Sequence, residues 1–274
     1  MQLIGTVDAL AKALDAERCS GRTIGLVPTM GAWHDGHLSL MRRADEECDV
    51  VAATIFVNPL QFGPHENLEE YPRDLERDRA MAEEAGVDYL FAPSDEEMYP
   101  EVPRTRVTVG GCDVGLEAAS RPGHLEGVAT VVTKLFALAG PCRAYFGEKD
   151  YEQLQVVRRL ASDLSFPVQV TPCPTVRAPD GLALSSRNAY LSEEERRAAP
   201  VLYRALRAGA ARVEAGERDP AVVRRAIRAV VESEHLAELD YAETRQGEQE
   251  WRLFVAARLG ATRLIDNVAV PVRD

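Results

Sequence analysis

The chain has 274 residues, 46% of them hydrophobic and 28% charged, with a formal net charge of −12 at pH 7. This composition is that of an ordinary globular protein with one large domain and a smaller one. The acidic balance disfavours nucleic acid as a partner, and no apolar run approaches the ~20 residues of a membrane-spanning helix.

Short apolar strands and amphipathic helices alternate along the first two thirds of the chain. Residues 23–27 are predicted as a buried strand, and residues 49–57 (DVVAATIFV) as a strand covered on both faces. The other predicted strands are 87–91, 106–109, 144–146 and 168–170, and the predicted helices are 37–47, 72–85, 125–139 and 151–163. This order predicts an α/β fold, a Rossmann-like parallel sheet with helices on both faces.

The pattern changes after about residue 176. Residues 193–215 and 220–234 are predicted as long amphipathic helices, followed by short strands at 240–244, 251–257 and 262–270. These elements predict a smaller C-terminal α+β domain at 176–274, after a Rossmann-like domain at 1–175.

Five scattered cysteines (Cys19, Cys48, Cys112, Cys142 and Cys173) form no Cys-x-x-Cys pair. Such a set is typical of a reducing cytoplasm rather than of a disulfide framework or a zinc site. The first residues, MQLIGTVDALAKAL, lack the basic start and small-residue cleavage site of a secretory signal. We therefore expect a cytoplasmic protein.

The stretch TMGAWHDGH (residues 29–37) lies between the first predicted strand and a helix. Gly31 and Gly36 let the backbone approach a ligand closely. His34 and His37 share one face of the first helical turn, where unpaired N–H groups attract phosphate. Two cationic imidazole donors at this place favour phosphate binding. A metal site, for which no third ligand is evident, and a pair of surface histidines remain as alternatives.

Two further segments follow predicted strands, at the sheet edge where parallel sheets bind ligands. In NPLQFG (58–63), Gln61 carries a donor and an acceptor that suit a neutral hydroxy-acid group, or it is simply a turn residue. In GEKDYEQ (147–153), Lys149 is one of only three lysines and suits phosphate, and Asp150 can accept from ribose hydroxyls. Gln153 lies one turn further, on the face of Asp150; a solvated charge run is the alternative here.

Two loops complete the set. DGLALSSRN (180–188) places two hydroxyls beside Arg187, which is either a phosphate clamp or a plain polar loop. RPGHLEGV (121–128) leads into a helix with His124 near its start, to bind a carboxylate or to cap the helix. The common phosphate loops GxxxxGK[ST] and GxGxxG are absent, so ATP binding would need another device.

Taken together and in this order, PTMGAWHDGH, FVNPLQFG with YPRDLERD, RPGHLEGV, YFGEKDYEQL and DGLALSSRN span essentially the whole chain. In this combination the chain resembles the pantothenate synthetase (pantoate–β-alanine ligase) family of the HxGH nucleotidyltransferase superfamily. The resemblance implies ATP-dependent condensation of (R)-pantoate with β-alanine through a pantoyl adenylate, giving pantothenate, AMP and pyrophosphate. It also implies Mg²⁺ accompanying ATP, a lid role for the second domain, and a homodimer.

The resemblance further assigns site residues, by their positions in the matching segments. The implied catalytic residues are His37, His34, Lys149 and Arg187. The implied ATP-binding residues are Met30, Gly31, Ala32, Trp33, His34, Asp35, Gly36, His37, Gly147, Glu148, Lys149, Asp150, Val176, Leu184, Ser185, Ser186 and Arg187. The implied substrate-binding residues are Gln61, Gln153 and Asn58, and Asp78 matches an acidic position near the metal.

The chain departs from the family pattern at a few places. Trp33 stands where leucine is usual, Leu125 where phenylalanine is common, and Leu184 where methionine is frequent. Other adenylyltransferases share the HxGH turn but have no reason to carry NPLQFG and GEKDYEQL together. A non-catalytic nucleotide sensor is disfavoured by the retained histidines, Lys149 and the serine–arginine loop, and an aminoacyl-tRNA synthetase by the acidic balance.

Overall fold

The structure is a computed structural model that describes residues 1–63, 68–69, 71–111 and 116–272. It divides into two compact units, Met1–Pro174 and Thr175–Asp274. The strands of the first unit are β1 (Gln2–Ile4), β2 (Ile24–Val27), β3 (Val50–Thr54), β4 (Tyr89–Phe91), β5 (Cys142–Gly147) and β6 (Val168–Cys173). Its helices are α1 (Val7–Cys19), α2 (Asp35–Glu47), α3 (Leu75–Glu84), α4 (Asp95–Met98), α5 (Glu117–Ser120), α6 (His124–Ala139) and α7 (Tyr151–Asp163), with 3₁₀ turns η1 (Pro59–Gln61) and η2 (Glu148–Asp150).

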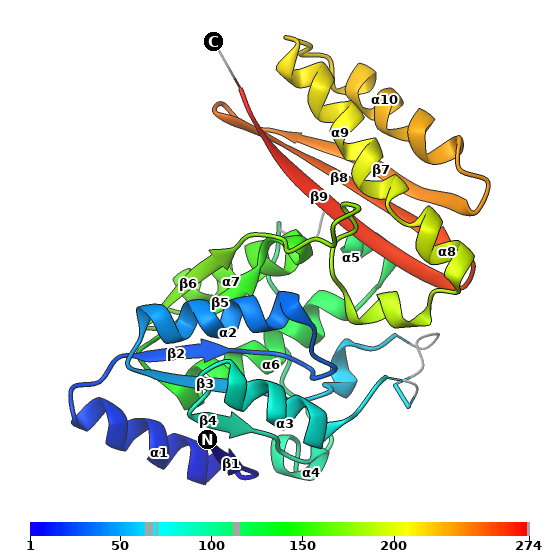
Figure 1. Cartoon of the computed structure of the whole chain (residues 1–274). Coiled ribbons are helices and arrows are strands. Elements are labelled where there is room, and N and C mark those ends of the chain that lie inside the picture. The colour runs from blue at the N-terminus through cyan, green and yellow to red at the C-terminus, as the bar shows by residue number, and fades with distance from the viewer. Residues whose placement is uncertain (64–67, 70, 112–115, 273–274) are drawn as a thin grey trace. The chain divides into compact units, whose positions relative to one another are not determined.

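The six strands form one parallel sheet in the order β1-β4-β3-β2-β5-β6 (Figure 1). The chain builds outward from β2 through β3 to β4, then returns to place β5 on the other side of β2. Strand order therefore reverses between β2 and β5, and ligands of open α/β sheets bind beyond the carboxyl ends of strands at such a point. This topology confirms the predicted α/β fold.

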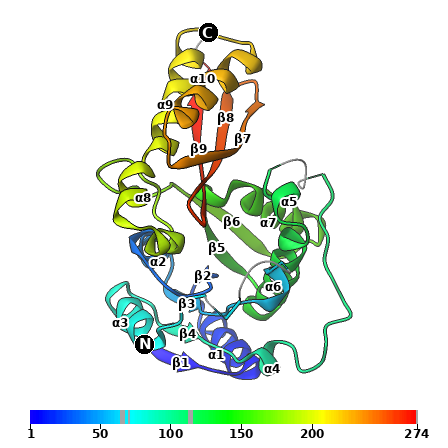
Figure 2. The ribbon, with the colours of Figure 1, turned by 90° about the vertical axis from the view of Figure 1, so that its right-hand side faces the viewer.

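Helices cover both faces of this sheet, because successive strand residues point to opposite sides. Ala52 packs toward α1, α6 and α7, whereas its neighbours Val51 and Ala53 pack toward α2 and α3. Figure 2 separates the two layers, with α2 and α3 on one side and α6 and α7 on the other. The buried strands thus read as continuous apolar runs, as strands covered on both faces do.

Two elements at the start of the chain were not predicted. Strand β1 has only three residues, and its central residue Leu3 is 43% exposed, so its apolar pattern is weak. Helix α1 begins after Thr6, whose side chain accepts the N–H of Ala9 as an N-cap, and it buries Leu10 and Leu14.

The predicted strand at 106–109 is wrong. The N–H of Val107 donates to Thr130 Oγ1 at 3.0 Å instead of to a strand partner. Val107 and Val109 pack against the core beside α6 without joining the sheet. The alternating apolar residues of this segment are therefore buried by packing against α6 and not by pairing with a strand.

The second unit is a three-stranded antiparallel sheet with helices. Its strands are β7 (Ala237–Gln246), β8 (Glu250–Leu259) and β9 (Thr262–Pro271), and its helical elements are η3 (Ser186–Tyr190), α8 (Glu193–Ala198), α9 (Val201–Glu214) and α10 (Pro220–Glu232). Figure 1 shows α9 and α10 together on one face of the sheet. The predicted helix at 193–215 is interrupted near Pro200, which has no N–H to continue the ladder.

Among the described residues, no helix is both long and apolar enough to cross a membrane. Four of the five cysteines, Cys19, Cys48, Cys142 and Cys173, are free thiols. Cys112 lies outside the described residues.

Candidate active site

The histidine turn, residues 29–37, connects β2 to α2. His34 is the N-cap of α2, and its Nδ1 accepts the backbone N–H of Gly36 at 3.1 Å. His37 lies in the first turn of the helix, with its ring centroid 4.2 Å from that of His34. Because Nδ1 of His34 is an acceptor, the proton of its neutral ring sits on Nε2 and is available to a ligand.

Both imidazoles are neutral at pH 7. Burial and then the charge of Lys149 lower the pKa of His34 to about 4. Burial and then the neighbouring His34 lower the pKa of His37 to about 3. The prediction of two cationic donors is therefore wrong, because burial disfavours the imidazolium form. Neutral rings still donate one N–H each, and Nδ1 of His37 is buried with no hydrogen-bond partner among the described residues.

The lowered pKa values predict a loss of stability in acid. Below pH 6.5 the unfolded chain protonates both histidines while the folded protein does not, so stability falls as the pH drops from about 6.5 toward about 4 and 3. At pH 5 the loss is on the order of 1–2 kcal/mol per histidine. We expect the melting temperature to drop more between pH 7.5 and 5 in the wild type than in a His34→Asn/His37→Asn variant, which keeps an N-cap acceptor.

His235 supplies the control for this comparison, since its side chain is 87% exposed. His235→Asn, a change at this exposed side chain, should leave the melting temperature at pH 7.5 near the wild-type value. An equal pH dependence in the wild type and the double variant would contradict the assignment of neutral, buried rings.

Asn58 is completely buried, and its side-chain amide is saturated with hydrogen bonds. Its Nδ2 donates to Gln61 Oε1 at 3.1 Å and to the carbonyl of Gly127 at 3.0 Å. Its Oδ1 accepts from the N–H of Leu60 at 3.2 Å and the hydroxyl of Tyr99 at 3.0 Å. Asn58 therefore orients Gln61, whose amide nitrogen is the end of that side chain turned away from Asn58.

Gln61 lies against the histidine turn. Its Nε2 is 2.8 Å from the sulfur of Met30, a residue of the turn. Its backbone carbonyl is 2.9 Å from Nδ1 of His124, and Nε2 of His124 is 2.8 Å from Arg121 Nη1. Since a carbonyl and a guanidinium flank the ring, a neutral His124 carries its proton on Nδ1.

Lys149 and Asp150 follow β5, across the switch point from the histidine turn. They lie in η2, and Lys149 Nζ is 3.4 Å from Asp150 Oδ1. Lys149 acts on the pKa of both histidines, so the lysine and the rings share one electrostatic neighbourhood. Gln153 is half-buried on the first turn of α7. The first unit thus brings together the histidines, Lys149 and Asp150.

The remaining predicted residues lie in the second unit, where they form their own group. The N–H of Leu184 donates to the carbonyl of Val176 at 3.0 Å. Ser185 caps η3 by accepting the N–H of Arg187 at 3.3 Å. Residues 176 and 184–187 are therefore neighbours within this unit.

A family model for pantoate-beta-alanine ligase matches residues 2–269. The pantothenate synthetase of Moorella thermoacetica is 50% identical over 283 residues, covering all of both chains, and that of Rubrobacter xylanophilus is 53% identical over 93% of each. The crystal structure of pantothenate synthetase from Thermus thermophilus is 51% identical, with a TM-score of 0.92 over 98% of this chain and 99% of that one. This chain belongs to the pantoate-beta-alanine ligase family. The predicted resemblance is confirmed.

A second solved structure of the pantoate-beta-alanine ligase family carries ligands. The ligase from Francisella tularensis, complexed with beta-gamma ATP and beta-alanine, is 34% identical, with a TM-score of 0.82 over 98% of this chain and 97% of that one.

Trp33, the departure from the usual leucine of this ligase family, is accommodated in the core. Its side chain is 1% exposed and packs in the layer between the sheet and α2. The indole N–H donates to Thr29 Oγ1 at 2.7 Å, so the extra donor is satisfied within the histidine turn.

Two residues near the site were missed by sequence reasoning. Gly127 allows α6 to touch η1, because a Cβ there would lie 2.2 Å from the carbonyl oxygen of Leu60. Tyr99 donates to Asn58, and burial raises the pKa of its hydroxyl to about 12, which keeps the donor protonated. Gly127 stands inside RPGHLEGV, so an unexplained glycine within a helix was the available signal.

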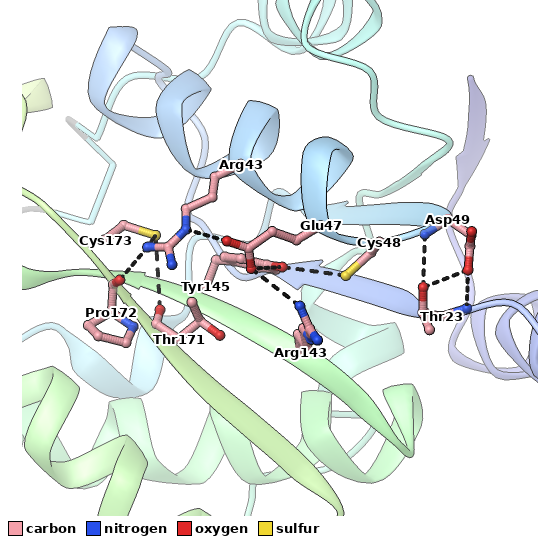
Figure 3. A network of polar contacts seen from close by, with 10 residues as sticks. All are labelled: Thr23, Arg43, Glu47, Cys48, Asp49, Arg143, Tyr145, Thr171, Pro172 and Cys173. Carbon is pink, nitrogen blue, oxygen red and sulfur yellow. Dashed lines mark hydrogen bonds and ion pairs between the residues drawn. The ribbon is translucent and has the colours of Figure 1, made fainter.

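The far end of α2 is held by a second network, drawn in Figure 3. Arg43 donates to Glu47 Oε1 at 2.8 Å and to the carbonyl of Pro172 at 2.7 Å. The hydroxyl of Tyr145 donates to Glu47 Oε2 at 3.0 Å. These contacts fix α2 against β5 and β6, so the helix that carries the histidines is anchored at its other end.

Proposed function

We propose that this chain condenses (R)-pantoate with β-alanine, using ATP and releasing AMP and pyrophosphate through a pantoyl adenylate. The observation that supports this most is the grouping at the switch point. His34 and His37 follow β2, Lys149 follows β5, and Gln61 lies against the same turn through Met30. Phosphate donors and an oriented amide at the carboxyl ends of adjacent strands suit the transfer of an adenylyl group to a hydroxy acid.

In the first step, a carboxylate oxygen of pantoate attacks the α-phosphorus of ATP, and the bond to pyrophosphate breaks. The two neutral imidazoles donate N–H groups to the phosphates, and Lys149 adds a fixed positive charge. Negative charge that grows on the leaving pyrophosphate is stabilised by these donors, while Gln61 and Gln153 hold pantoate in line.

The remaining contacts to ATP are proposed from both units. The turn 30–37 and residues 147–150 line the phosphates and ribose, with Asp150 accepting from ribose hydroxyls. In the second unit, Val176 offers backbone to adenine, and residues 184–187, including Arg187, close on the β- and γ-phosphates as a lid. Water is thereby kept from the adenylate.

In the second step, the amine of β-alanine attacks the acyl carbon of the adenylate. The carbon–nitrogen bond forms, the bond to AMP breaks, and the amine loses a proton. In our proposal β-alanine enters beside Gln61, whose backbone carbonyl contacts the ring of His124.

We propose that Mg²⁺ arrives with ATP as part of the substrate. The described residues include no group of three or more His, Cys, Asp or Glu side chains arranged to hold a metal ion. Asp78, the predicted metal residue, has both carboxylate oxygens bonded to backbone N–H groups. It therefore does not fit a resident metal site, and no step is assigned to a metal held by this chain.

We also propose a cytoplasmic homodimer, as the family resemblance implies. Sedimentation equilibrium of the purified protein tests the dimer: a mass of twice 30.1 kDa is expected, and a mass of one chain at micromolar concentration would refute it.

ATP–pyrophosphate exchange tests the proposed function. Exchange is measured with and without pantoate, in the absence of β-alanine. We expect exchange only when pantoate is present, because the adenylate forms and reverts. No exchange, with ATP still bound, would favour a nucleotide sensor. Exchange with another acid or nucleotide would favour a different adenylyltransferase.

Gln153→Ala is expected to raise the KM for pantoate about tenfold and to leave the KM for ATP near the wild-type value. The reason is that a lost neutral hydrogen bond to substrate is worth roughly 1–1.5 kcal/mol. Gln169→Ala is the matched control, since Gln169 is an exposed glutamine near the start of β6, at the end of the strand away from the proposed site. Equal increases in both KM values would place Gln153 outside the pantoate site.

A further inference from the structure

Asp78, on the first turn of α3, binds the backbone of the histidine turn. Its side chain is 1% exposed. Oδ2 accepts the N–H of Ala32 at 2.8 Å, and Oδ1 accepts the N–H of Trp33 at 3.0 Å. Both oxygens of the carboxylate are thus engaged by the backbone N–H groups of the two residues immediately before the N-cap His34.

This part of the turn has a backbone that needs external support. Gly31 and Ala32 both have positive φ, 83° and 53°, and for alanine the left-handed region costs roughly 1–2 kcal/mol. Successive N–H groups in such a conformation form a concave site for an anion. The carboxylate of Asp78 fills that site from within the protein, through hydrogen bonds strengthened by its charge.

The opposite side of the turn is fixed by Thr29. Its Oγ1 accepts the N–H of Gly31 at 3.1 Å and the indole N–H of Trp33 at 2.7 Å. The same hydroxyl donates to the carbonyl of Thr54 at 2.5 Å, at the end of β3. Asp78 and Thr29 together therefore hold residues 31–33 by four hydrogen bonds.

We propose that Asp78 is a positioning residue, which sets the positions of His34 and His37 by holding the backbone N–H groups of the two residues that precede His34. It acts through the backbone rather than by ligating a metal ion. The role of the histidines rests on the proposed function, but the contact between Asp78 and the turn does not. The two parts can therefore be tested separately.

Asp78→Asn is the first test, because the amide replaces one acceptor oxygen by an NH₂ group facing a backbone N–H. The control is Glu76→Gln, which removes a charge from an exposed side chain in the same helical turn. In pantoate-dependent ATP–pyrophosphate exchange, we expect Asp78→Asn to lower kcat at least tenfold. The Mg²⁺ concentration that gives half-maximal activity should stay at the wild-type value in both variants.

A readout independent of activity uses the two tryptophans of the chain. In protein labelled with 5-fluorotryptophan, Trp251→Phe assigns the two ¹⁹F resonances. Asp78→Asn should shift or broaden the Trp33 resonance and leave that of Trp251 unchanged, whereas Glu76→Gln should change neither. The Trp33 line could change in Asp78→Asn while the wild type shows no ATP–pyrophosphate exchange. That result would support the contact between Asp78 and the turn and would refute the proposed function.

Two outcomes would overturn the inference. One is an unchanged Trp33 resonance in Asp78→Asn together with a raised Mg²⁺ requirement, which would make Asp78 a metal residue. The other is measured on the wild-type protein with added Mn²⁺, so it does not depend on whether a variant folds. Mn²⁺ added without nucleotide should leave the Trp33 line sharp, and selective broadening of that line would place a cation at the carboxylate.

Discussion

His37→Ala is expected to lower the kcat of pantothenate formation by about 10²–10³, the usual cost of removing one preorganised donor to a developing anion. The ring of His37 is buried, and its pKa is lowered to about 3. It keeps a nitrogen, Nδ1, without a hydrogen-bond partner among the described residues. Leaving a buried polar atom without a partner costs free energy, and this cost supports the proposal that His37 serves a ligand.

Steady-state kinetics and thermal unfolding, measured on the same preparation, check this result. The melting temperature should stay within a few degrees of the wild type, so that the lost turnover reports on the transition state. His235→Ala, a change at a side chain that is 87% exposed, should keep wild-type turnover. Near-normal kcat in His37→Ala would remove the proposed role of the histidine turn.

Gly127→Ala is expected to have the second large effect, through packing alone. The added Cβ would lie 2.2 Å from the carbonyl oxygen of Leu60 and 2.6 Å from the Cα of Gln61. These are backbone atoms, so relief requires α6 or η1 to move. Overpacking of this kind costs about 1–3 kcal/mol, and displacing a positioning side chain by about 1 Å costs on the order of 10²-fold in rate.

We therefore expect Gly127→Ala to lower the melting temperature and to reduce kcat/KM for pantoate about 100-fold. The carbonyl of Gly127 also accepts from Asn58, so the amide that orients Gln61 moves with it. Gly5→Ala is the matched control, because a Cβ at Gly5 meets nothing within 4 Å. A folded Gly127→Ala protein with wild-type kcat/KM for pantoate would show that η1 does not set the substrate position.

Local pattern was enough to predict most of the sheet and the family. The buried strands are continuous apolar runs ended by proline or glycine, and the five sequence segments keep their order in the chain. The strand at 106–109 shows the limit of this approach, because the same alternation is satisfied by packing beside α6 and by one bond to Thr130. Alternation alone does not say whether a neighbouring strand is present.

The contacts that hold the site residues in place could not be predicted from local sequence pattern, because they join residues that are distant in the chain. Asp78 and Ala32 are 46 residues apart, and Asn58 and Gly127 are 69 apart. The protonation of the histidines was likewise mispredicted, since a burial-driven pKa shift depends on the folded surroundings and not on the two ring positions.

The contacts of the histidine turn also imply an order of assembly during synthesis. Those that close the turn join residues 25 and 46 apart, to Thr54 and Asp78, whereas Arg43 at the far end of α2 reaches Pro172 across 129 residues. Since a chain emerges from the ribosome N-terminus first, the turn can close on its carboxylate before β5, Lys149 and β6 exist. A nascent chain stalled ahead of β5 therefore already contains the residues that close the turn, while it lacks the lysine of the proposed phosphate site.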